Sequence, residues 1–205
     1  AMSVEVLGVL ASVAFFARLT PQPIRLWRTG VPDGVSPMAA MNAALSDIGW
    51  ILYGLAAGLV PVWLTAVVAL VPGVWTVWLL RREATRRDLL WSCVWLATIG
   101  LAWASGTLVA ILGVSVIVNQ GPQVARALRE RDLRGVSPTT YVLALADAGL
   151  WGAYGVAADD VAVMGYAVVL FAAAVTVLTR IWWTRRSATS RLGVGPELAA
   201  DAATA

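Results

Sequence analysis

Apolar residues occupy long stretches of the chain, and short polar segments separate them. We expect helices over Val4–Leu19, Ser36–Gly58, Pro61–Leu80, Leu89–Ala104, Gly106–Gln120, Ser137–Ala157 and Val161–Trp183. A transmembrane helix needs about 17–25 residues, so these stretches approach or reach the length that crosses a bilayer. Ser36 and Pro37 are a typical helix start, with serine as N-cap and proline at the first helical position. The pattern predicts an all-α integral membrane protein.

One group of residues occurs twice in the chain, and every pair is separated by 101 positions. The first copy contains Pro21-Gln22, Gly34-Val35-Ser36-Pro37, Trp50 and Tyr53-Gly54, and the second contains Pro122-Gln123, Gly135-Val136-Ser137-Pro138, Trp151 and Tyr154-Gly155. Two unrelated apolar helices often share Leu, Ala and Val. They rarely share Pro, Gln, Ser, Trp and Tyr in unbroken register, so we infer an internal repeat.

The repeat organises the expected helices as two three-helix units joined by a linker helix. The boundaries are 3–83 for the first unit, 84–104 for the linker, 105–186 for the second unit, and 187–205 for a cytoplasmic tail that we expect to be disordered. Three helices reverse the direction of the chain, so one more helix is needed before the second unit can lie parallel to the first. We therefore expect seven transmembrane helices in a 3+1+3 arrangement.

The composition supports a membrane protein. Hydrophobic residues make up 60% of the chain and charged residues 13%, with a mean hydropathy of +0.77. In soluble domains about 45–50% of the residues are hydrophobic and about 25% are charged. The single cysteine, Cys93, excludes an internal disulfide, and the absence of histidine excludes imidazole catalysis and histidine metal sites. We expect no cofactor, no metal site and no enzymatic activity.

The arginines indicate how the chain is oriented. All fifteen basic residues are arginines, at positions 18, 25, 28, 81, 82, 86, 87, 126, 129, 131, 134, 180, 185, 186 and 191. Seven spans with the N-terminus outside place every one of them on the cytoplasmic side, while an opposite loop carries Asp159 and Asp160. We expect a multi-pass protein of the cell (inner) membrane with a cytoplasmic C-terminus. Its arginines would contact lipid headgroups and not nucleic acid.

Asp47 and Asp147 are the carboxylates inside the apolar spans. An ionisable group at the centre of a bilayer costs at least about 2.5–3.5 kcal/mol, so it normally faces a polar cavity. Asp47 precedes Trp50 by three residues and Asp147 precedes Trp151 by four, which places each carboxylate near its tryptophan. Either residue could bind a solute, carry a coupling proton or hold a neighbouring helix. The position equivalent to Asp147 in the first repeat is Ser46.

Trp50 and Trp151 lie in the middle of their spans, too deep for the aromatic belt at a membrane interface. An indole ring can stack against a sugar ring or pack in the core. Asn42 precedes Trp50 by eight residues and could reach the same cavity. The tryptophans expected to anchor the chain at the interface are Trp27, Trp91, Trp103, Trp182 and Trp183.

The Pro-Gln pairs, Pro21-Gln22 and Pro122-Gln123, lie at the cytoplasmic ends of the first and fifth spans. Proline removes a backbone donor and leaves carbonyls of the preceding turn free, which favours a hinge. Glutamine can bond these carbonyls or cap a neighbouring helix. Proline could also simply terminate the span, but a second copy in register favours the hinge.

These motifs resemble the PQ-loop repeat superfamily, and the layout is similar to that of a SWEET (MtN3/saliva) sugar transporter over about Val4–Trp183. The resemblance implies that each tryptophan and the residue four before it line a central pocket. These residues are Trp50 with Ser46 and Trp151 with Asp147.

The resemblance also implies a sugar-binding asparagine sixteen residues after each tryptophan, where this chain has Ala66 and Ala167. Thr65 and Tyr166 are adjacent but lie about 100° around the helix. A Leu-x-Asp-x-Gly pattern at 45–49 and 145–149 is similar to the proton-coupled branch of the superfamily, which transports amino acids.

Together these features predict a carrier in which a small solute binds between the repeats, and the repeats rock about the Pro-Gln hinges. The leading hypothesis is facilitative transport of a mono- or disaccharide. A proton-coupled amino-acid transporter is the first alternative, with Asp47 or Asp147 taking the proton. A non-transporting receptor of the same fold is the second. The solute, the direction of flux and the formation of a homo-oligomer stay open.

Overall fold

The computed structural model describes residues 3–30, 36–113, 115–129 and 138–191, and the side chains of all of these except 122, 123, 126, 185 and 187–191. The tail was predicted to begin at residue 187, but residues 187–191 form the end of a helix, so the expected disorder was wrong there. Residues 192–205 and the Gly-Val-Ser segment of the second repeat lie outside the described residues.

All regular secondary structure in the described part of the chain is α-helical. The helices are α1 (Val4–Leu19), α2 (Pro21–Thr29), α3 (Pro37–Ala57), α4 (Val60–Leu79), α5 (Arg86–Ala104), α6 (Leu108–Gly113), α7 (Ser115–Arg129), α8 (Pro138–Ala157) and α9 (Val161–Arg191). The predicted all-α membrane fold is confirmed. In the 3+1+3 count, α1 with α2 forms one span and α6 with α7 forms another.

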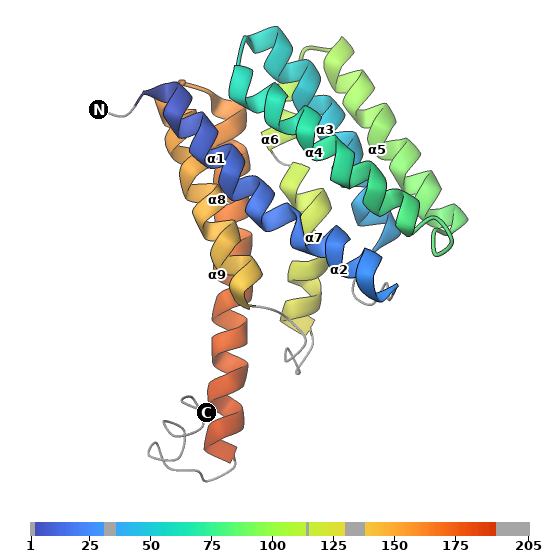
Figure 1. Ribbon diagram of the computed structural model, residues 1–205, viewed down its shortest axis with the longest axis vertical. Coiled ribbons are helices and arrows are strands. Elements are labelled where there is room, and N and C mark those ends of the chain that lie inside the picture. The colour runs from blue at the N-terminus through green and yellow to red at the C-terminus, as the bar shows by residue number, and fades with distance from the viewer. Residues whose placement is uncertain (1–2, 31–35, 114, 130–137, 192–205) are drawn as a thin grey trace.

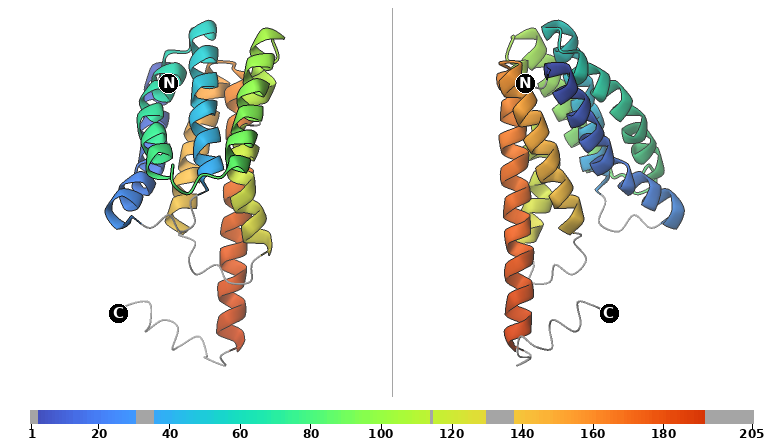
Figure 2. Two further views of the ribbon diagram at one scale, coloured as in Figure 1. Left: turned by 90° about the vertical axis from the view of Figure 1, so that its right-hand side faces the viewer. Right: turned by 60° about the vertical axis from the view of Figure 1, so that its left-hand side comes forward.

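Six spans close into a ring (Figures 1 and 2). Going around it, α1 packs on α4, α4 on α3, α3 on α6 and α7, these on α9, α9 on α8, and α8 returns to α1. The linker α5 stands outside the ring against α3 and α6. Each repeat contributes a consecutive half of the ring, so the repeats meet at two seams: α1 with α8, and α3 with α6 and α7.

Local sequence sets where the helices begin. Ser36 caps α3 as predicted, because its hydroxyl accepts a hydrogen bond from Ala39 N at 3.3 Å. Thr85 and Asp88 form a capping box, so α5 begins at Arg86. The prediction that this helix begins at Leu89 was therefore wrong, because residues 86–88 form the first turn of α5.

The fifth span also differs from the prediction. A single helix over Gly106–Gln120 was expected; the structure describes α6 (Leu108–Gly113) and α7 (Ser115–Arg129), so the helical segment continues past Gln120 to Arg129, and residue 114 lies outside the described residues. The Ser115 hydroxyl donates to Leu112 O at 2.8 Å. A Cβ built on Gly165 of α9 would lie 3.4 Å from the Gly113 backbone, so the two helices approach closely here.

Two matching glycines allow the tightest hairpins of the fold. A Cβ on Gly54 would lie 2.8 Å from Trp63 N, and one on Gly155 would lie 3.0 Å from Met164 N. Either would force the backbones apart. The glycine of each Tyr-Gly pair therefore lets α3 pack closely against α4 and α8 against α9.

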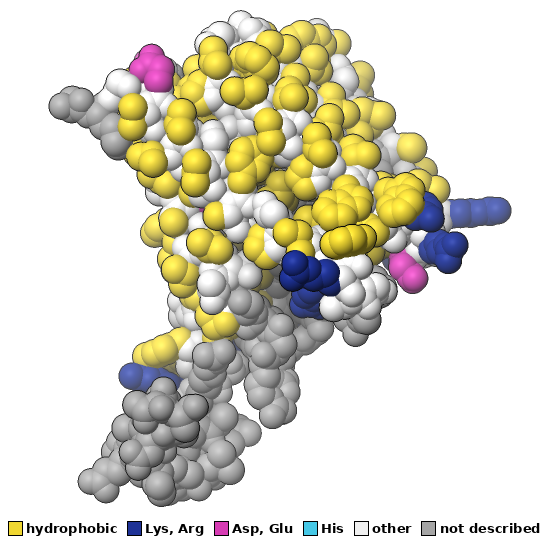
Figure 3. Space-filling view, viewed as in Figure 1, with side chains coloured by type: hydrophobic (Ala, Val, Ile, Leu, Met, Phe, Trp, Pro, Cys, Tyr) yellow, Lys and Arg dark blue, Asp and Glu magenta, His cyan; other side chains and the backbone are white. Residues whose placement is uncertain are grey.

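The outside of the molecule suits a lipid environment. Hydrophobic side chains dominate the described part of the face seen in Figure 3, and the dark blue basic side chains lie in its lower half. Val71, Leu101 and Val156 are each about 70% exposed. Three described segments are long and apolar enough to cross a membrane on hydropathy alone: Val4–Thr29, Val60–Leu79 and Val161–Thr184. Polar residues inside α3 and α8 lower their hydropathy, and these residues face the ring interior or the neighbouring helices.

Candidate functional site

A cavity of about 270 Å³ lies inside the ring, and both repeats line it. Its wall includes Trp50 and Trp151 and continues to Gln22, Ser36 and Thr140. Ser36 and Thr140 stand at the starts of α3 and α8 and are exposed. The cavity therefore extends to the end of the bundle that carries Arg25, Arg28, Arg81 and Arg82, which we call the arginine end.

Inter-repeat contacts close the opposite end, where α3 turns into α4 and α8 into α9. Ala11, Val62, Trp151, Tyr154 and Val163 form a buried apolar cluster there.

A hydrogen bond joins the repeats in the same region. Tyr53 Oη of α3 donates to Asp160 Oδ2, and the other oxygen of Asp160 accepts from Val163 N at 2.8 Å. Asp160 therefore caps α9 and holds α3 at the same time. The sequence predicts an outer loop at Asp160 and no role for it, because a loop carboxylate carries no signal of a distant partner.

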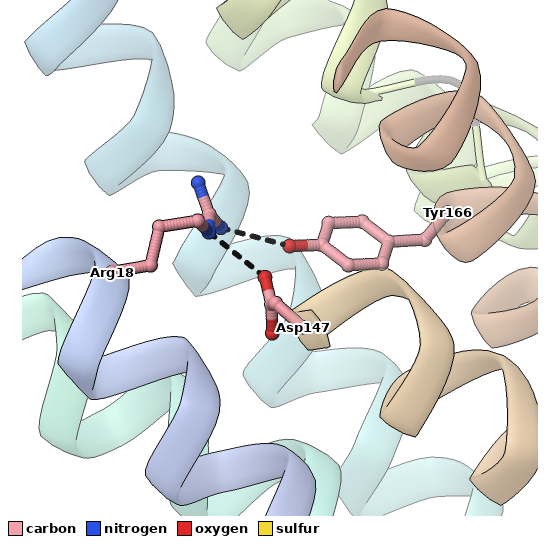
Figure 4. Close-up of polar contacts among 3 residues, drawn as sticks. All are labelled: Arg18, Asp147 and Tyr166. Atoms are coloured by element: carbon pink, nitrogen blue, oxygen red, sulfur yellow. Dashed lines mark hydrogen bonds and ion pairs between the residues drawn. The ribbon is translucent and has the colours of Figure 1, made fainter. Parts of the chain in front are cut away.

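A buried ion pair crosses the cavity wall at the first seam (Figure 4). Arg18 Nε of α1 donates to Asp147 Oδ2 of α8 at 2.8 Å, and Arg18 Nη2 donates to Tyr166 Oη of α9 at 3.2 Å. Asp147 has no exposed surface, while Arg18 is 13% exposed and lines the cavity. Charge-assisted bonds of this kind are short and strong when both partners are oriented.

Arg18 corrects the sequence analysis, which assigned every arginine to topology and lipid headgroups. The chain continues past Leu19 into α2, so Arg18 lies inside the bundle and not at its end. Its buried carboxylate partner sits 129 residues away in the chain, and no local pattern could indicate that contact.

The second seam carries the equivalent contact. Positions 18 and 119 correspond through the repeat, as do 46 and 147. Asn119 Nδ2 of α7 donates to Ser46 Oγ of α3 at 3.5 Å. Arg18 with Asp147 and Asn119 with Ser46 are thus repeat-related pairs, one charged and one neutral.

Ser46 uses its hydrogen-bonding capacity within the protein. Its hydroxyl donates to Asn42 O at 2.8 Å and accepts from Trp95 Nε1 of α5 at 3.0 Å, in addition to Asn119. A hydroxyl has one donor and two acceptor positions. Ser46 touches the cavity but has no bond left to offer a solute in this arrangement, and the linker helix helps to fix it.

Asp47 faces the cavity without a hydrogen bond. Its side chain lines the wall one turn before Trp50, and it makes no hydrogen bond or ion pair with any described residue, although Arg18 attracts it electrostatically. Gly73 of α4 lies beside it, and a Cβ built there would be 3.8 Å from Asp47 Oδ2.

The other predicted site residues divide into two groups. Trp50 and Trp151 both line the cavity, and the Trp50 ring meets Tyr166 edge-on with 5.6 Å between centroids. Asn42 is buried but does not line the cavity, because its α3 position faces the neighbouring helices. The expectation that it reaches the cavity was wrong.

The two alanines in the place of the expected amides are both buried. Thr65 and Tyr166, one residue before each, line the cavity and supply the hydroxyls that Ala66 and Ala167 lack. Thr65 Oγ1 also shares a hydrogen bond with Ser12 Oγ. The rotation of about 100° did not exclude either residue, because the cavity is wide enough to meet both faces.

The structure places the Pro-Gln pairs differently in the two repeats. Pro21 separates α1 from α2, and Thr20 Oγ1 bonds Phe16 O at 2.7 Å. Gln22 lines the cavity and makes no hydrogen bond to a described residue, so it bonds no freed carbonyl. Pro122 lies within α7, and the side chains of Pro122 and Gln123 are outside the description.

Among the described residues, no group of three or more His, Cys, Asp or Glu side chains could hold a metal ion. No protein-family model and no curated protein matches the chain by sequence. A eukaryotic SWEET transporter, solved at 3.7 Å resolution, matches in structure with a TM-score of 0.67 and 12% sequence identity. The match covers 89% of this chain and 97% of that one. The chain has the SWEET transporter fold.

The SWEET fold accounts for the ring and the linker. In this fold the chain supplies two three-helix units, and the cavity lies between them. At 12% identity the likeness concerns the fold, so the roles of the lining residues rest on their own geometry.

Proposed function

We propose that this protein is a membrane carrier that moves a small polar solute by alternating access. The observation that supports it is a cavity with walls from both repeats, extended to one end and closed at the other by contacts between the repeats. By the positive-inside rule the arginine end is cytoplasmic and the N-terminus outside, in the cell (inner) membrane. The cavity then faces the cytoplasm in this conformation.

Within that proposal, a sugar is the first candidate solute. The transporter fold favours it, and so do the two tryptophans on the wall, whose rings can stack on a sugar. Trp50 and Trp151 would flank the solute, while Asn119 and Tyr166 would bond its hydroxyls. Ser46 would position Asn119, and transport would be facilitative uniport about hinges at the Pro-Gln pairs.

A second candidate is a proton-coupled amino-acid carrier. The charged lining favours it, because Arg18 and Asp47 face the same cavity and Asp147 is buried directly behind Arg18. This candidate predicts flux that follows a pH gradient and is uncoupled in Asp147→Asn, whereas uniport predicts flux that ignores the gradient.

Flux into proteoliposomes tests the proposal. Labelled glucose, sucrose and a mixed amino-acid panel would be offered with and without an imposed pH gradient. We expect saturable flux of at least one solute, reduced about tenfold or more in Trp50→Ala, because truncating a buried aromatic contact typically costs 1–2 kcal/mol or more. Trp103→Ala, on the outside of α5 and 48% exposed, is the matched control and should retain flux.

If no solute in the panel is transported although the protein is folded and inserted, that result would contradict the carrier function and favour a receptor. Equal flux in the parent and in Trp50→Ala would contradict the assignment of the cavity as the path.

A further inference from the structure

The charges around the cavity do not balance. Among the described residues that line it, Arg18 and Asp47 are charged. Asp147, which lies behind Arg18 with no exposed surface, already neutralises the guanidinium. Asp47 makes no hydrogen bond or ion pair with a described residue, and the cation that attracts it through space, Arg18, is already paired with Asp147. One carboxylate in the middle of the bundle is therefore left for an occupant to neutralise.

The buried hydrogen-bonding atoms that have no partner around the cavity are acceptors, in line with the excess of negative charge. Asn119 Oδ1 and Asp147 Oδ1 are buried without a hydrogen bond, and both are acceptors. Asp47 adds two more acceptor oxygens. The guanidinium of Arg18 keeps N–H groups beyond its two bonds, which can bind a hydroxyl or carbonyl oxygen. They do not change the charge balance, because Asp147 has already matched Arg18.

We infer that the solute carries a protonated amine, whose ammonium group binds at Asp47. An ammonium brings one positive charge, which balances Asp47, and three N–H donors for the carboxylate and amide oxygens beside it. Trp50 lies one helical turn from Asp47 and meets Tyr166, so aromatic rings stand close to the bound cation and can add a cation–π contribution. The inference rests on the proposed carrier function and specifies its solute.

A neutral solute satisfies this cavity less well. Its hydroxyls can donate to Asp47, but they leave the carboxylate's charge uncompensated inside the membrane, where it is costly. The positive charge on the solute, and not the carbon skeleton, is therefore the feature that the site selects.

Two matched pairs of solutes test this. Isothermal titration calorimetry on the full chain in lipid nanodiscs would compare glucosamine with glucose and alaninamide with lactamide, pairs in which an ammonium replaces a hydroxyl. Within each pair the carbon skeleton is shared, and the first member has one more positive charge at a pH where its amine is protonated. We expect the first member to bind about tenfold or more tightly, the size of one hydrogen bond to a charged group.

The variant Asp47→Asn keeps the shape and removes the charge, so we expect it to abolish the preference within each pair. Asp159→Asn removes the same charge from an exposed loop position and should keep the preference. If Asp47→Asn does not fold, the two pairs measured on the parent chain still decide the question.

Equal affinities within both pairs would overturn the inference, and so would a preference that survives in Asp47→Asn. Protonation of Asp47 by solvent would give the first of these results. Because the measurement needs binding and not flux, its failure differs from failure of the carrier: a protein that transports glucose and binds both members equally remains a carrier of neutral solutes.

Discussion

At the residue scale, the polar groups of the cavity follow the repeat, but their chemistry has diverged. One seam holds a guanidinium and a carboxylate, and the other holds an amide and a hydroxyl at equivalent positions. The register of the repeat could be derived from the sequence. The pairing of Arg18 with Asp147 could not, because sequence spacing places both on helices without showing that those helices adjoin.

Arg18→Met tests the ion pair. It leaves Asp147 buried without its cation, and removing one partner of a buried pair costs about 3–5 kcal/mol. We expect a clear loss of thermal stability in detergent, and recovery of much of it in Arg18→Met/Asp147→Leu, which removes both charges. Arg81→Met, at an exposed arginine stacked on Trp78, is the control and should change stability little. If Arg18→Met alone were as stable as the parent, that result would contradict the ion pair between Arg18 and Asp147.

Ser46 and Trp95 provide a second test at this scale. Ser46→Ala leaves the buried Trp95 indole N–H without its acceptor, which costs about 1–3 kcal/mol. Adding Trp95→Phe removes the orphaned donor, so the double variant should lose less than the sum of the two single losses. Additive losses of stability would show that the linker helix does not hold Ser46.

At the scale of elements, apolar stretches and start signals predicted most helices to within a few residues. Ser36 indicated the start of α3 because a cap is a local interaction. The extensions of α7 to Arg129 and of α9 to Arg191 were missed. Both helices continue through polar residues where hydropathy gives no signal.

Glycine variants test the close hairpin of α3 and α4. Gly54→Ala places a methyl group 2.8 Å from the Trp63 backbone, so we expect destabilisation of about 1–3 kcal/mol by overpacking. Gly149→Ala is the matched control, because no atom lies within 4 Å of its Cβ. There alanine should stabilise α8 by up to about 1 kcal/mol through helix propensity. Thermal melts in the same detergent that rank the two variants in the opposite order would contradict the packing.

At the scale of the whole molecule, the ring gives the two repeats two seams and one cavity. Access to the cavity can alternate if contacts at the closed end break while the arginine end narrows. Tyr53 with Asp160 is the polar contact that joins α3 to α9 there. Its repeat equivalent, Tyr154, makes no hydrogen bond to a described residue, so a single hydrogen bond distinguishes the two tyrosines.

The most direct test of alternating access is the distance between spin labels across each end, measured by double electron–electron resonance in nanodiscs. Labels at Ala57 and Ala157 report the closed end, and labels at Glu83 and Thr184 report the arginine end, in a Cys93→Ser background. In Tyr53→Phe we expect a longer population at the closed end and a shorter one at the arginine end, with Tyr154→Phe like the parent. Unchanged distances, or both ends widening together, would contradict the account.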